Sequence, residues 1–258
     1  MQFNFYKYQG TGNDFVLIDN RNSFFPKENF SLVQQLCDRK FGIGADGLML
    51  LETAEAYDFR MIYYNADGKE GTMCGNGGRC ICAFAQHLKL VGESGVFIAV
   101  DGEHEYKISG NEVELKMIDV NNIHAISTED FELFTGSPHY VRFLNDLKKL
   151  DIIKEAHQIR YNETYAKEGI NVNFVEIIDN NIYMRTYERG VEDETLSCGT
   201  GTVAVALSVA NKFGNKENIS IQTPGGILSV SFVQNANTFS DIWLKGPATL
   251  VFSGIINV

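Results

Sequence analysis

Short runs rich in β-branched and aromatic residues, bounded by residues that favour turns, recur along most of the chain. Runs of this kind are typical of β-strands. Strands are expected over residues 15–19, 48–52, 59–64, 96–100, 113–117, 173–178, 182–187, 219–222, 227–232 and 241–245. Helical spacing is rarer: residues 31–40 form a predicted amphipathic helix capped by Ser31, and residues 145–151 are expected to end another. The pattern predicts a chain made mostly of sheet.

Two further helical stretches, residues 79–90 and 202–213, are apolar on nearly every face. A helix of this kind is normally buried on all sides. In a chain rich in strands, each helix would have to be surrounded by sheet. The prediction is therefore an α/β (α+β) fold with two pseudo-symmetric domains, each a mostly antiparallel curved sheet or barrel wrapped around a central buried helix.

The two predicted domains resemble copies of one another. When Cys74 is aligned with Cys198, a predicted strand precedes each cysteine, a glycine-rich turn follows it, and the apolar helix comes next. Internal duplication of this kind predicts two similar domains whose equivalent turns face each other. We expect an N-terminal domain over residues 1–120, onto which residues 248–258 pack back, and a C-terminal domain over residues 121–247.

The turns CGNGG at Cys74 and CGTG at Cys198 combine a thiol with the start of a helix. The N–H groups at a helix start have no partner within the helix and can bind a carboxylate. The helix dipole also lowers the pKa of a thiol beside it, so that thiolate is available near neutral pH. If both turns face one substrate, one thiolate can remove an α-proton while the opposite thiol returns a proton to the other side. The turns thus predict a two-base amino-acid isomerase that uses no cofactor.

The overall charge narrows the choice of partner. The chain has 258 residues and a formal net charge of −11. This argues against a nucleic-acid or anionic-membrane partner, because both require a basic surface.

No apolar stretch is long enough for a signal peptide or a membrane span. An odd number of cysteines, five, without an export signal points to reduced thiols. We therefore expect a cytoplasmic protein that acts on a small molecule.

The other three cysteines have a simpler explanation. Cys80 and Cys82 lie inside one apolar helix and Cys37 lies on another helix, so all three are expected to be buried apolar residues. The spacing Cys74-x5-Cys80-x-Cys82 is poor for a tetrahedral zinc site, and no metal is predicted. A disulfide between Cys74 and Cys198 can be imagined on oxidation, but it would abolish the proposed chemistry.

Several motifs share their order and spacing with one enzyme family. They are GTGNDF at 10–15, GIGAD at 42–46, NADG at 65–68, MCGNGGR at 73–79, SPH at 137–139, YERG at 187–190 and SCGTG at 197–201. Over essentially its whole length the sequence resembles diaminopimelate epimerase. The resemblance implies interconversion of LL- and meso-2,6-diaminopimelate without pyridoxal phosphate or metal, in lysine and cell-wall precursor biosynthesis. It also makes a homodimer a reasonable expectation.

The resemblance implies a role for each matching residue. The acid/base pair of the family matches Cys74 and Cys198. Positions that help to set the protonation of these cysteines match His139 and Glu188. The backbone cradle for the reacting carboxylate matches Gly75, Asn76, Gly199 and Thr200. The remaining substrate contacts match Asn13, Asn65, Asn171, Glu188 and Arg189.

The chemistry of these polar residues suits a substrate that carries a second amino-acid group at its far end. Arg189 can donate a forked pair of hydrogen bonds to the distal carboxylate. The three asparagines, Asn13, Asn65 and Asn171, can supply both donors and acceptors. Without the resemblance, Asn13 and Asn65 would also be typical turn residues. Glu188 and Arg189 could equally form an ordinary surface ion pair.

Three features depart from the family pattern. Gly47 stands where many members carry a glutamine that touches the substrate, so no substrate contact is assigned to Gly47. Ser137 stands where many members carry asparagine, and its contact is left open. The stretch from Glu188 to Cys198 is one residue longer than in many members.

Two other functions stay open. One is a proline-racemase-like isomerase of the same fold, and the other is a non-catalytic amino-acid-binding protein. The polar residues for a distal amino-acid group favour diaminopimelate over proline. A thiol in each of the two turns favours catalysis over binding alone.

Overall fold

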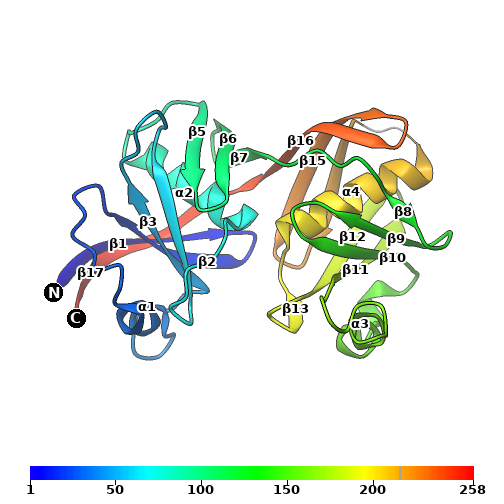
Figure 1. Ribbon diagram of the computed structural model, residues 1–258, viewed down its shortest axis with the longest axis horizontal. Helices are drawn as coiled ribbons and strands as arrows, with labels where there is room; N and C mark the ends of the chain where they lie inside the picture. The colour runs from blue at the N-terminus through cyan, green and yellow to red at the C-terminus, as the bar shows by residue number, and fades with distance from the viewer. Residues whose placement is uncertain (215–216) are drawn as a thin grey trace. The chain divides into compact units, whose positions relative to one another are not determined.

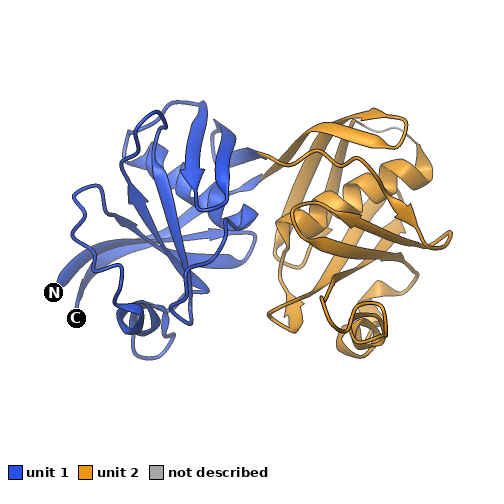
Figure 2. Cartoon of the chain, viewed as in Figure 1, with its two compact units in different colours: residues 1–115, 246–258 blue, residues 116–245 orange. Residues whose placement is uncertain are grey.

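The computed structural model describes residues 1–214 and 217–258. The chain divides into two compact units (Figure 2): unit 1 comprises Met1–Leu115 with Gly246–Val258, and unit 2 comprises Lys116–Lys245. Within each unit the strands pair in one continuous order, and each unit has its own long helix (Figure 1). The fold is mixed α/β, mostly sheet with few helices, which confirms the predicted fold class.

The sheet of unit 1 follows the strand order β17–β1–β2–β3–β4–β5–β6–β7. Its strands are β1 (Gln2–Gly10), β2 (Asn13–Asp19), β3 (Gly47–Glu52), β4 (Arg60–Asn65), β5 (Ser94–Ala99), β6 (Gly102–Ser109), β7 (Glu112–Lys116) and β17 (Thr249–Asn257). Two helices are inserted, α1 (Phe30–Cys37) between β2 and β3 and α2 (Gly75–His87) between β4 and β5. The pairing of β1 with β17 brings the two chain ends side by side (Figure 1).

The sheet of unit 2 follows the order β8–β9–β10–β11–β12–β14–β15–β16, and the short β13 also pairs with β12. Its strands are β8 (His124–Ala125), β9 (Asp130–Phe134), β10 (Pro138–Phe143), β11 (Asn171–Ile178), β12 (Asn181–Glu188), β13 (Asp193–Thr195), β14 (Asn218–Thr223), β15 (Gly226–Asn235) and β16 (Thr238–Pro247). Two α-helices are inserted, α3 (Ile152–Arg160) before β11 and α4 (Gly199–Phe213) before β14.

The two units repeat one pairing scheme. In unit 1, β2 pairs in parallel with β3, and β4 pairs in parallel with β5. In unit 2, β10 pairs in parallel with β11, and β12 pairs in parallel with β14. Parallel neighbours need a crossover, and in each unit one helix spans each of these two connections. The second crossover is α2 in unit 1 and α4 in unit 2, so the repeat in the sequence is matched by a repeat in topology.

The two crossover helices are buried on nearly every side, as their apolar composition predicted. In α4, every residue from Val203 to Leu207 is fully buried. This helix shares one core with Val175 of β11 and Leu228 of β15. In α2, Ile81 and Phe84 are likewise fully buried. Burying each large apolar side chain contributes roughly 1.5–3 kcal/mol, so the sheet of each unit is held to its helix mainly by the hydrophobic effect.

Two local predictions were wrong. The first helix is capped by Asn29, whose side chain accepts a hydrogen bond from the Leu32 N–H at 3.1 Å, and Ser31 instead donates to that Asn29 oxygen. The segment expected to end a helix is a short 3₁₀ helix, Leu147–Lys149, and α3 begins only after the Asp151 cap. The predicted fold class allowed either a curved sheet or a barrel, and among the described strand pairs neither sheet closes into a barrel.

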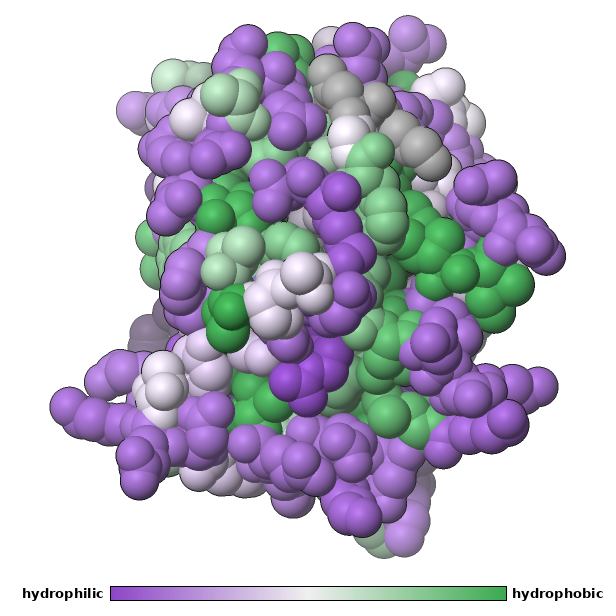
Figure 3. Space-filling model, turned by 90° about the vertical axis from the view of Figure 1, so that its right-hand side faces the viewer, coloured by the Kyte–Doolittle hydropathy of each residue, from purple (hydrophilic) through white to green (hydrophobic). Residues whose placement is uncertain are grey.

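Hydrophilic residues cover most of the face in Figure 3, with hydrophobic residues in smaller groups between them. The large apolar side chains of both units lie mainly in the interior. Within residues 1–214 and 217–258, no helix is both long and apolar enough to cross a membrane.

Candidate active site

Cys74 is the N-cap residue of α2, with extended backbone angles of φ −100° and ψ 132°. Its carbonyl accepts the first helical hydrogen bond, from the Gly78 N–H at 2.7 Å. The glycines that follow it are required by close packing. A Cβ at Gly77 would lie 2.8 Å from the Met49 side chain, and a Cβ at Gly78 would lie 2.8 Å from the Leu115 side chain. The turn therefore sinks the helix start into the sheet while Cys74 stays partly exposed.

The Cys74 sulfur contacts the predicted substrate residue Asn13. The thiol donates to Asn13 Oδ1 at 3.7 Å, and Asn76 Nδ2 donates to the same oxygen at 3.5 Å. On its other side, Asn13 Nδ2 donates to Asp46 Oδ2 at 2.6 Å. The amide of Asn13 is therefore held with its oxygen toward the cysteine turn. Unit 1 thus brings three of the predicted site residues together.

Asp46 belongs to a charged cluster that supports this contact. Arg39 Nη2 lies 2.7 Å from both Asp46 Oδ1 and Asp14 Oδ1, and Lys7 Nζ lies 2.7 Å from Asp14 Oδ2. Burial alone raises the pKa of the Asp14 carboxyl, but the hydrogen bonds and charges of Arg39 and Lys7 hold it well below its usual range. The Asp14 carboxyl is therefore ionised near neutral pH, and the Asp46 carboxyl group accepts the hydrogen bond from Asn13.

Arg79 lies fully buried in α2, one turn beyond the cysteine. Its Nη2 donates to Asn76 Oδ1 at 3.0 Å and to Thr11 Oγ1 at 3.2 Å, and its Nη1 donates to the Gly75 carbonyl at 3.4 Å. Burial lowers the pKa of the guanidinium, and the nearby Cys80 and Cys74 thiols oppose that shift. A buried guanidinium at this place fixes the Asn76 amide and puts a positive charge close to Cys74.

The side chain of Asn65 is hydrogen-bonded to a tyrosine of the same strand. The Tyr63 hydroxyl donates to Asn65 Oδ1 at 3.0 Å. The Tyr63 ring covers Gly47, which pairs with Asn65 across β3 and β4. A Cβ at Gly47 would lie 2.5 Å from Tyr63 Cε2 and 2.6 Å from the Tyr64 carbonyl oxygen, so a side chain cannot fit there without displacement. The tyrosine thus occupies the space that a longer residue at position 47 would need.

Cys198 stands in the same relation to α4 as Cys74 does to α2. It is the N-cap residue, with φ −128° and ψ 117°, and its carbonyl accepts from the Thr202 N–H at 2.9 Å. The Cys198 side chain is buried, and its sulfur lies 3.5 Å from Thr200 Oγ1. A Cβ at Gly201 would lie 3.3 Å from this sulfur and 2.5 Å from Asn173 Oδ1. The glycine is therefore required by the side chains that surround the turn.

His139 is the next member of the group in unit 2. Its Nε2 lies 2.9 Å from Thr200 Oγ1 and 2.9 Å from Ser137 Oγ. Its Nδ1 lies 3.1 Å from Asn173 Nδ2. Burial, together with the positive charge of Arg189, lowers the pKa of His139 to about 3. The imidazole is therefore neutral at any physiological pH.

The remaining predicted residues of unit 2 lie on β11 and at the end of β12. Asn171 Nδ2 donates to Ser137 Oγ at 3.1 Å, and Asn171 Oδ1 accepts from the Arg189 N–H at 2.9 Å. The exposed Arg189 side chain donates to the Glu168 carbonyl at 3.0 Å. Glu188 is the last residue of β12 and is partly exposed. Unit 2 thus brings Cys198, Thr200, His139, Asn171 and Arg189 into one connected region.

Comparison with known proteins identifies the family of the chain. The family model described as diaminopimelate epimerase matches residues 5–122 and 131–251. The chain belongs to the diaminopimelate epimerase family. The diaminopimelate epimerase of Flavobacterium psychrophilum is 50% identical over 255 residues, which cover 97% of this chain and 99% of the relative. That of Chlorobaculum tepidum is 42% identical over 260 residues, covering 96% and 99%.

Solved structures outside the diaminopimelate epimerase family share the fold. A phenazine biosynthesis protein of the PhzF family from Bacillus anthracis aligns with a TM-score of 0.78 at 14% identity, over 100% of both chains. A probable proline racemase from Agrobacterium radiobacter K84 aligns with a TM-score of 0.66 at 13% identity, over 99% of this chain and 92% of that one. Family membership and the racemase fold make the chain an isomerase of the epimerase type.

In this diaminopimelate epimerase family member the other cysteines are buried apolar residues. Burial raises the pKa of the Cys37 and Cys80 thiols to about 12, and it raises the pKa of Cys82 well above the ordinary value. None of the three can supply thiolate near neutral pH. Among the described residues, no group of three or more His, Cys, Asp or Glu side chains could hold a metal ion.

Four supporting residues escaped the sequence analysis. Asp46 and Arg79 lie inside quoted motifs of the diaminopimelate epimerase family, and a charged residue in an apolar helix was a signal that Arg79 is held by buried partners. Asn173 and Thr186 gave no such signal, because a single polar residue in a strand is usually on the exposed side. Both are in fact buried.

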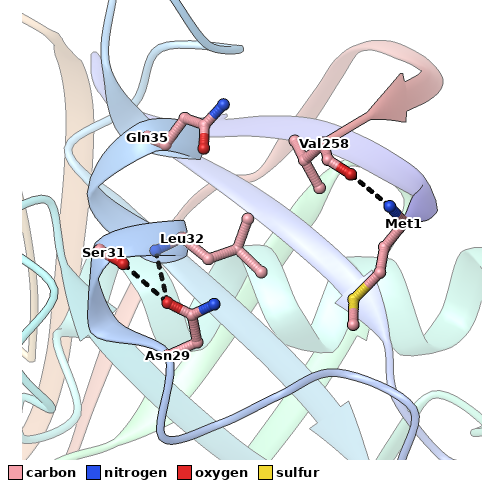
Figure 4. A pocket seen from close by; sticks show the side chains of 6 residues that line it. All are labelled: Met1, Asn29, Ser31, Leu32, Gln35 and Val258. Atoms are coloured by element: carbon pink, nitrogen blue, oxygen red, sulfur yellow. Dashed lines mark hydrogen bonds between the residues drawn. The ribbon is translucent and has the colours of Figure 1, made fainter.

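A hollow on the surface of unit 1 is separate from these residues (Figure 4). It is lined by Met1, Asn29, Ser31, Leu32, Gln35 and Val258. Its polar groups are largely used within the protein: Asn29 caps α1, and the Met1 amine donates to the Val258 carbonyl. The hollow includes none of the residues predicted to act in the epimerase family.

Proposed function

We propose that the chain interconverts LL- and meso-2,6-diaminopimelate, with Cys74 and Cys198 as the acid/base pair. The observation that carries the proposal is that each cysteine caps a buried helix through a glycine-rich turn, one in each unit of a diaminopimelate epimerase family member. Helix starts of this kind present N–H groups to an anion and favour thiolate at the cap. The two units would act as the two predicted domains.

The proposed reaction moves one proton off the substrate and another onto it. The thiolate of one cysteine takes the α-proton and becomes a thiol. The electron pair stays on the α-carbon and its carboxylate, and the other cysteine donates its proton to the opposite face and becomes a thiolate. The roles exchange in the reverse direction, so no cofactor enters the balance. N–H groups of Gly75, Asn76, Gly199 and Thr200 would stabilise the carboxylate as it gains charge.

The distal end of the substrate would be held by the remaining polar residues. Asn13 and Asn65 in unit 1, and Asn171, Glu188 and Arg189 in unit 2, are proposed for this role. Arg189 is exposed, and its guanidinium is bound only to a backbone carbonyl among the described contacts, which leaves donors for a carboxylate. Proline has no distal amino-acid group, so these residues support diaminopimelate as the substrate.

His139 would support the chemistry without exchanging a proton. Its pKa of about 3 makes it a poor base for a thiol at neutral pH. Its place 2.9 Å from Thr200 Oγ1 suits it instead to hold the hydroxyl beside Cys198. Glu188 is proposed to act on the protonation of the cysteines from the end of β12.

Deuterium uptake at the α-carbon tests the proposed function. Reduced protein is incubated with LL-diaminopimelate in D₂O without added cofactor and followed by NMR. The expected result is deuterium incorporation together with the meso form. Uptake with proline but not with diaminopimelate would support a racemase instead. No uptake with either substrate would leave an amino-acid-binding protein.

We further propose that two copies associate through β17. This strand pairs with β1 and exposes a row of apolar side chains, with Leu250, Val251, Phe252 and Ile255 each at least 37% exposed. Exposed apolar strands of this kind mark sites where another chain pairs. Sedimentation should give a dimer, and Ile255→Glu should give a monomer. A wild-type monomer at micromolar concentration would contradict the proposal.

A cytoplasmic location also stays a prediction.

A further inference from the structure

Asn173 is a buried asparagine between the strand that carries His139 and the strand that carries Thr186. It is fully buried on β11, beside Val141 of β10 and opposite Thr186 of β12 in the strand register. Neither Asn173 nor Thr186 belongs to the residues proposed above for substrate or acid/base roles. All the contacts involved lie within unit 2.

The orientation of the Asn173 amide is fixed by the Tyr140 carbonyl, because a carbonyl oxygen can only accept a hydrogen bond. Asn173 Nδ2 lies 3.0 Å from the Tyr140 carbonyl oxygen, which can only accept. Asn173 Oδ1 accepts from the Thr186 hydroxyl at 3.0 Å. A flipped amide would set its oxygen against the Tyr140 carbonyl. The second N–H of Asn173 must therefore point at His139 Nδ1, 3.1 Å away.

This contact decides which ring nitrogen of His139 carries the proton. Since Asn173 presents an N–H, His139 Nδ1 must accept and has no proton of its own. The neutral ring then carries its proton on Nε2, which lies 2.9 Å from both Ser137 Oγ and Thr200 Oγ1. The ring is thus a fixed hydrogen-bond donor toward the cysteine turn.

The direction of the hydroxyl protons follows from counting donors and acceptors. Ser137 Oγ accepts from Asn171 Nδ2 at 3.1 Å and lies 3.2 Å from Thr200 Oγ1. His139 Nε2–H also donates to these two hydroxyl oxygens. Ser137 is therefore left to donate its own hydroxyl proton to Thr200 Oγ1. The Thr200 proton is then directed at the Cys198 sulfur, 3.5 Å away. With the other tautomer, both hydroxyls could turn to Nε2 instead.

We propose that Asn173 is a positioning residue that fixes His139 as the Nε2–H tautomer and thereby commits the Thr200 hydroxyl to donate to Cys198. The inference rests on the proposed function of Cys198 as an acid/base residue. A hydrogen bond donated to sulfur favours the thiolate over the thiol. Asn173 and Thr186 thus act on the reacting sulfur through two intermediate side chains, without touching the substrate.

The tautomer itself is measured by NMR of ¹⁵N-labelled protein without substrate. Wild-type His139 should show a protonated Nε2 and an unprotonated Nδ1. Asn173→Asp replaces the N–H with a carboxylate oxygen and should move the proton to Nδ1. Thr195→Val is the matched control, because the buried Thr195 hydroxyl on the neighbouring strand has no hydrogen-bond partner among the described residues. A wild-type ring protonated on Nδ1 would overturn the proposal.

The effect on the ionisation of Cys198 is measured by the ultraviolet absorbance of its thiolate as the pH is varied. The part of the absorbance that belongs to Cys198 is the part that is lost in Cys198→Ser. Thr200→Val should lower the ionisation constant of Cys198 about tenfold, the size of one hydrogen bond to an anion. Thr200→Ser should restore it, and Thr195→Val should leave it unchanged. Equal ionisation in Thr200→Val and the wild type would overturn the proposal. Because neither measurement uses substrate, a failure here is distinct from a failure of epimerisation in D₂O.

Discussion

Arg79 donates a hydrogen bond to the side-chain oxygen of Asn76, 3.0 Å away, from within the buried part of α2. The Asn76 amide nitrogen in turn donates to Asn13 Oδ1, which also accepts a hydrogen bond from the Cys74 thiol. The cation therefore orders the first turn of the helix and lies near its cysteine. Burial of a guanidinium is costly unless its donors are used, and here several backbone and side-chain oxygens accept from it.

Arg79→Met should slow the alkylation of Cys74 by iodoacetamide at neutral pH, because the variant loses a positive charge that favours thiolate. A reduction of about tenfold corresponds to a change of one unit in pKa. Peptide mass spectrometry distinguishes Cys74 from the other thiols. Arg79→Lys keeps the positive charge, so its rate of Cys74 alkylation should lie between those of the wild type and Arg79→Met. Equal rates in wild type and Arg79→Met would show that the charge has no effect on the sulfur.

Cys74→Ser and Cys198→Ser should each lower kcat by about 10²–10⁴-fold, the contribution typical of a positioned acid or base. Serine keeps the N-cap geometry, so KM for diaminopimelate should change little. The measurement is coupled epimerisation in both directions. Cys37→Ala is the control, since the Cys37 thiol is buried in α1 and should affect stability rather than rate. Full activity in either serine variant would remove that cysteine from the mechanism.

His139 makes stability depend on pH. Its folded pKa of about 3 lies below the ordinary value of 6.5, so between these values the unfolded chain binds a proton that the folded protein does not. Stability from this group is complete above pH 6.5 and is lost as the pH falls. The loss is about 1.4 kcal/mol per unit, or about 2 kcal/mol from pH 6.5 to 5.

Urea unfolding at several pH values measures this dependence. His139→Gln should remove the His139 part of the slope while leaving the part due to carboxylates. His104→Gln, at a more exposed strand position, serves as the comparison. The same slope in wild type and His139→Gln would mean that His139 is protonated in the folded state.

Gly201→Ala should destabilise the protein, although alanine normally stabilises a helix. The added Cβ would lie 2.5 Å from Asn173 Oδ1, which is already fixed by Thr186. Overpacking of this kind costs about 1–3 kcal/mol, more than the 0.5–1 kcal/mol that alanine gains in a helix. Thermal unfolding measures the change. Gly92→Ala, where a Cβ meets nothing within 4 Å, should be neutral or slightly stabilising.

Local patterns were sufficient to predict most of the regular structure. Runs of apolar residues bounded by turn residues predicted strands such as β3 and β12, and all-round apolar composition predicted the buried helices α2 and α4. The glycine-rich turns placed Cys74 and Cys198 at helix starts. These features are encoded by neighbours in the sequence, because side-chain period and turn chemistry are local properties. The α3 helix was missed because its exposed charged residues weaken the apolar signal.

The sequence by itself thus determined the fold class, the repeat, the family resemblance and the two cysteine turns. Only the tertiary structure decided what supports them: Asp46 holds Asn13 across 33 residues, Asn173 holds His139 across 34, and Arg79 reaches the Pro247 carbonyl across 168. Each of these contacts joins elements that are far apart in the sequence, and Asn173, His139 and Arg79 are in addition fully buried. A buried polar group must find a partner wherever the fold places one, so its role cannot be deduced from its neighbours in the chain.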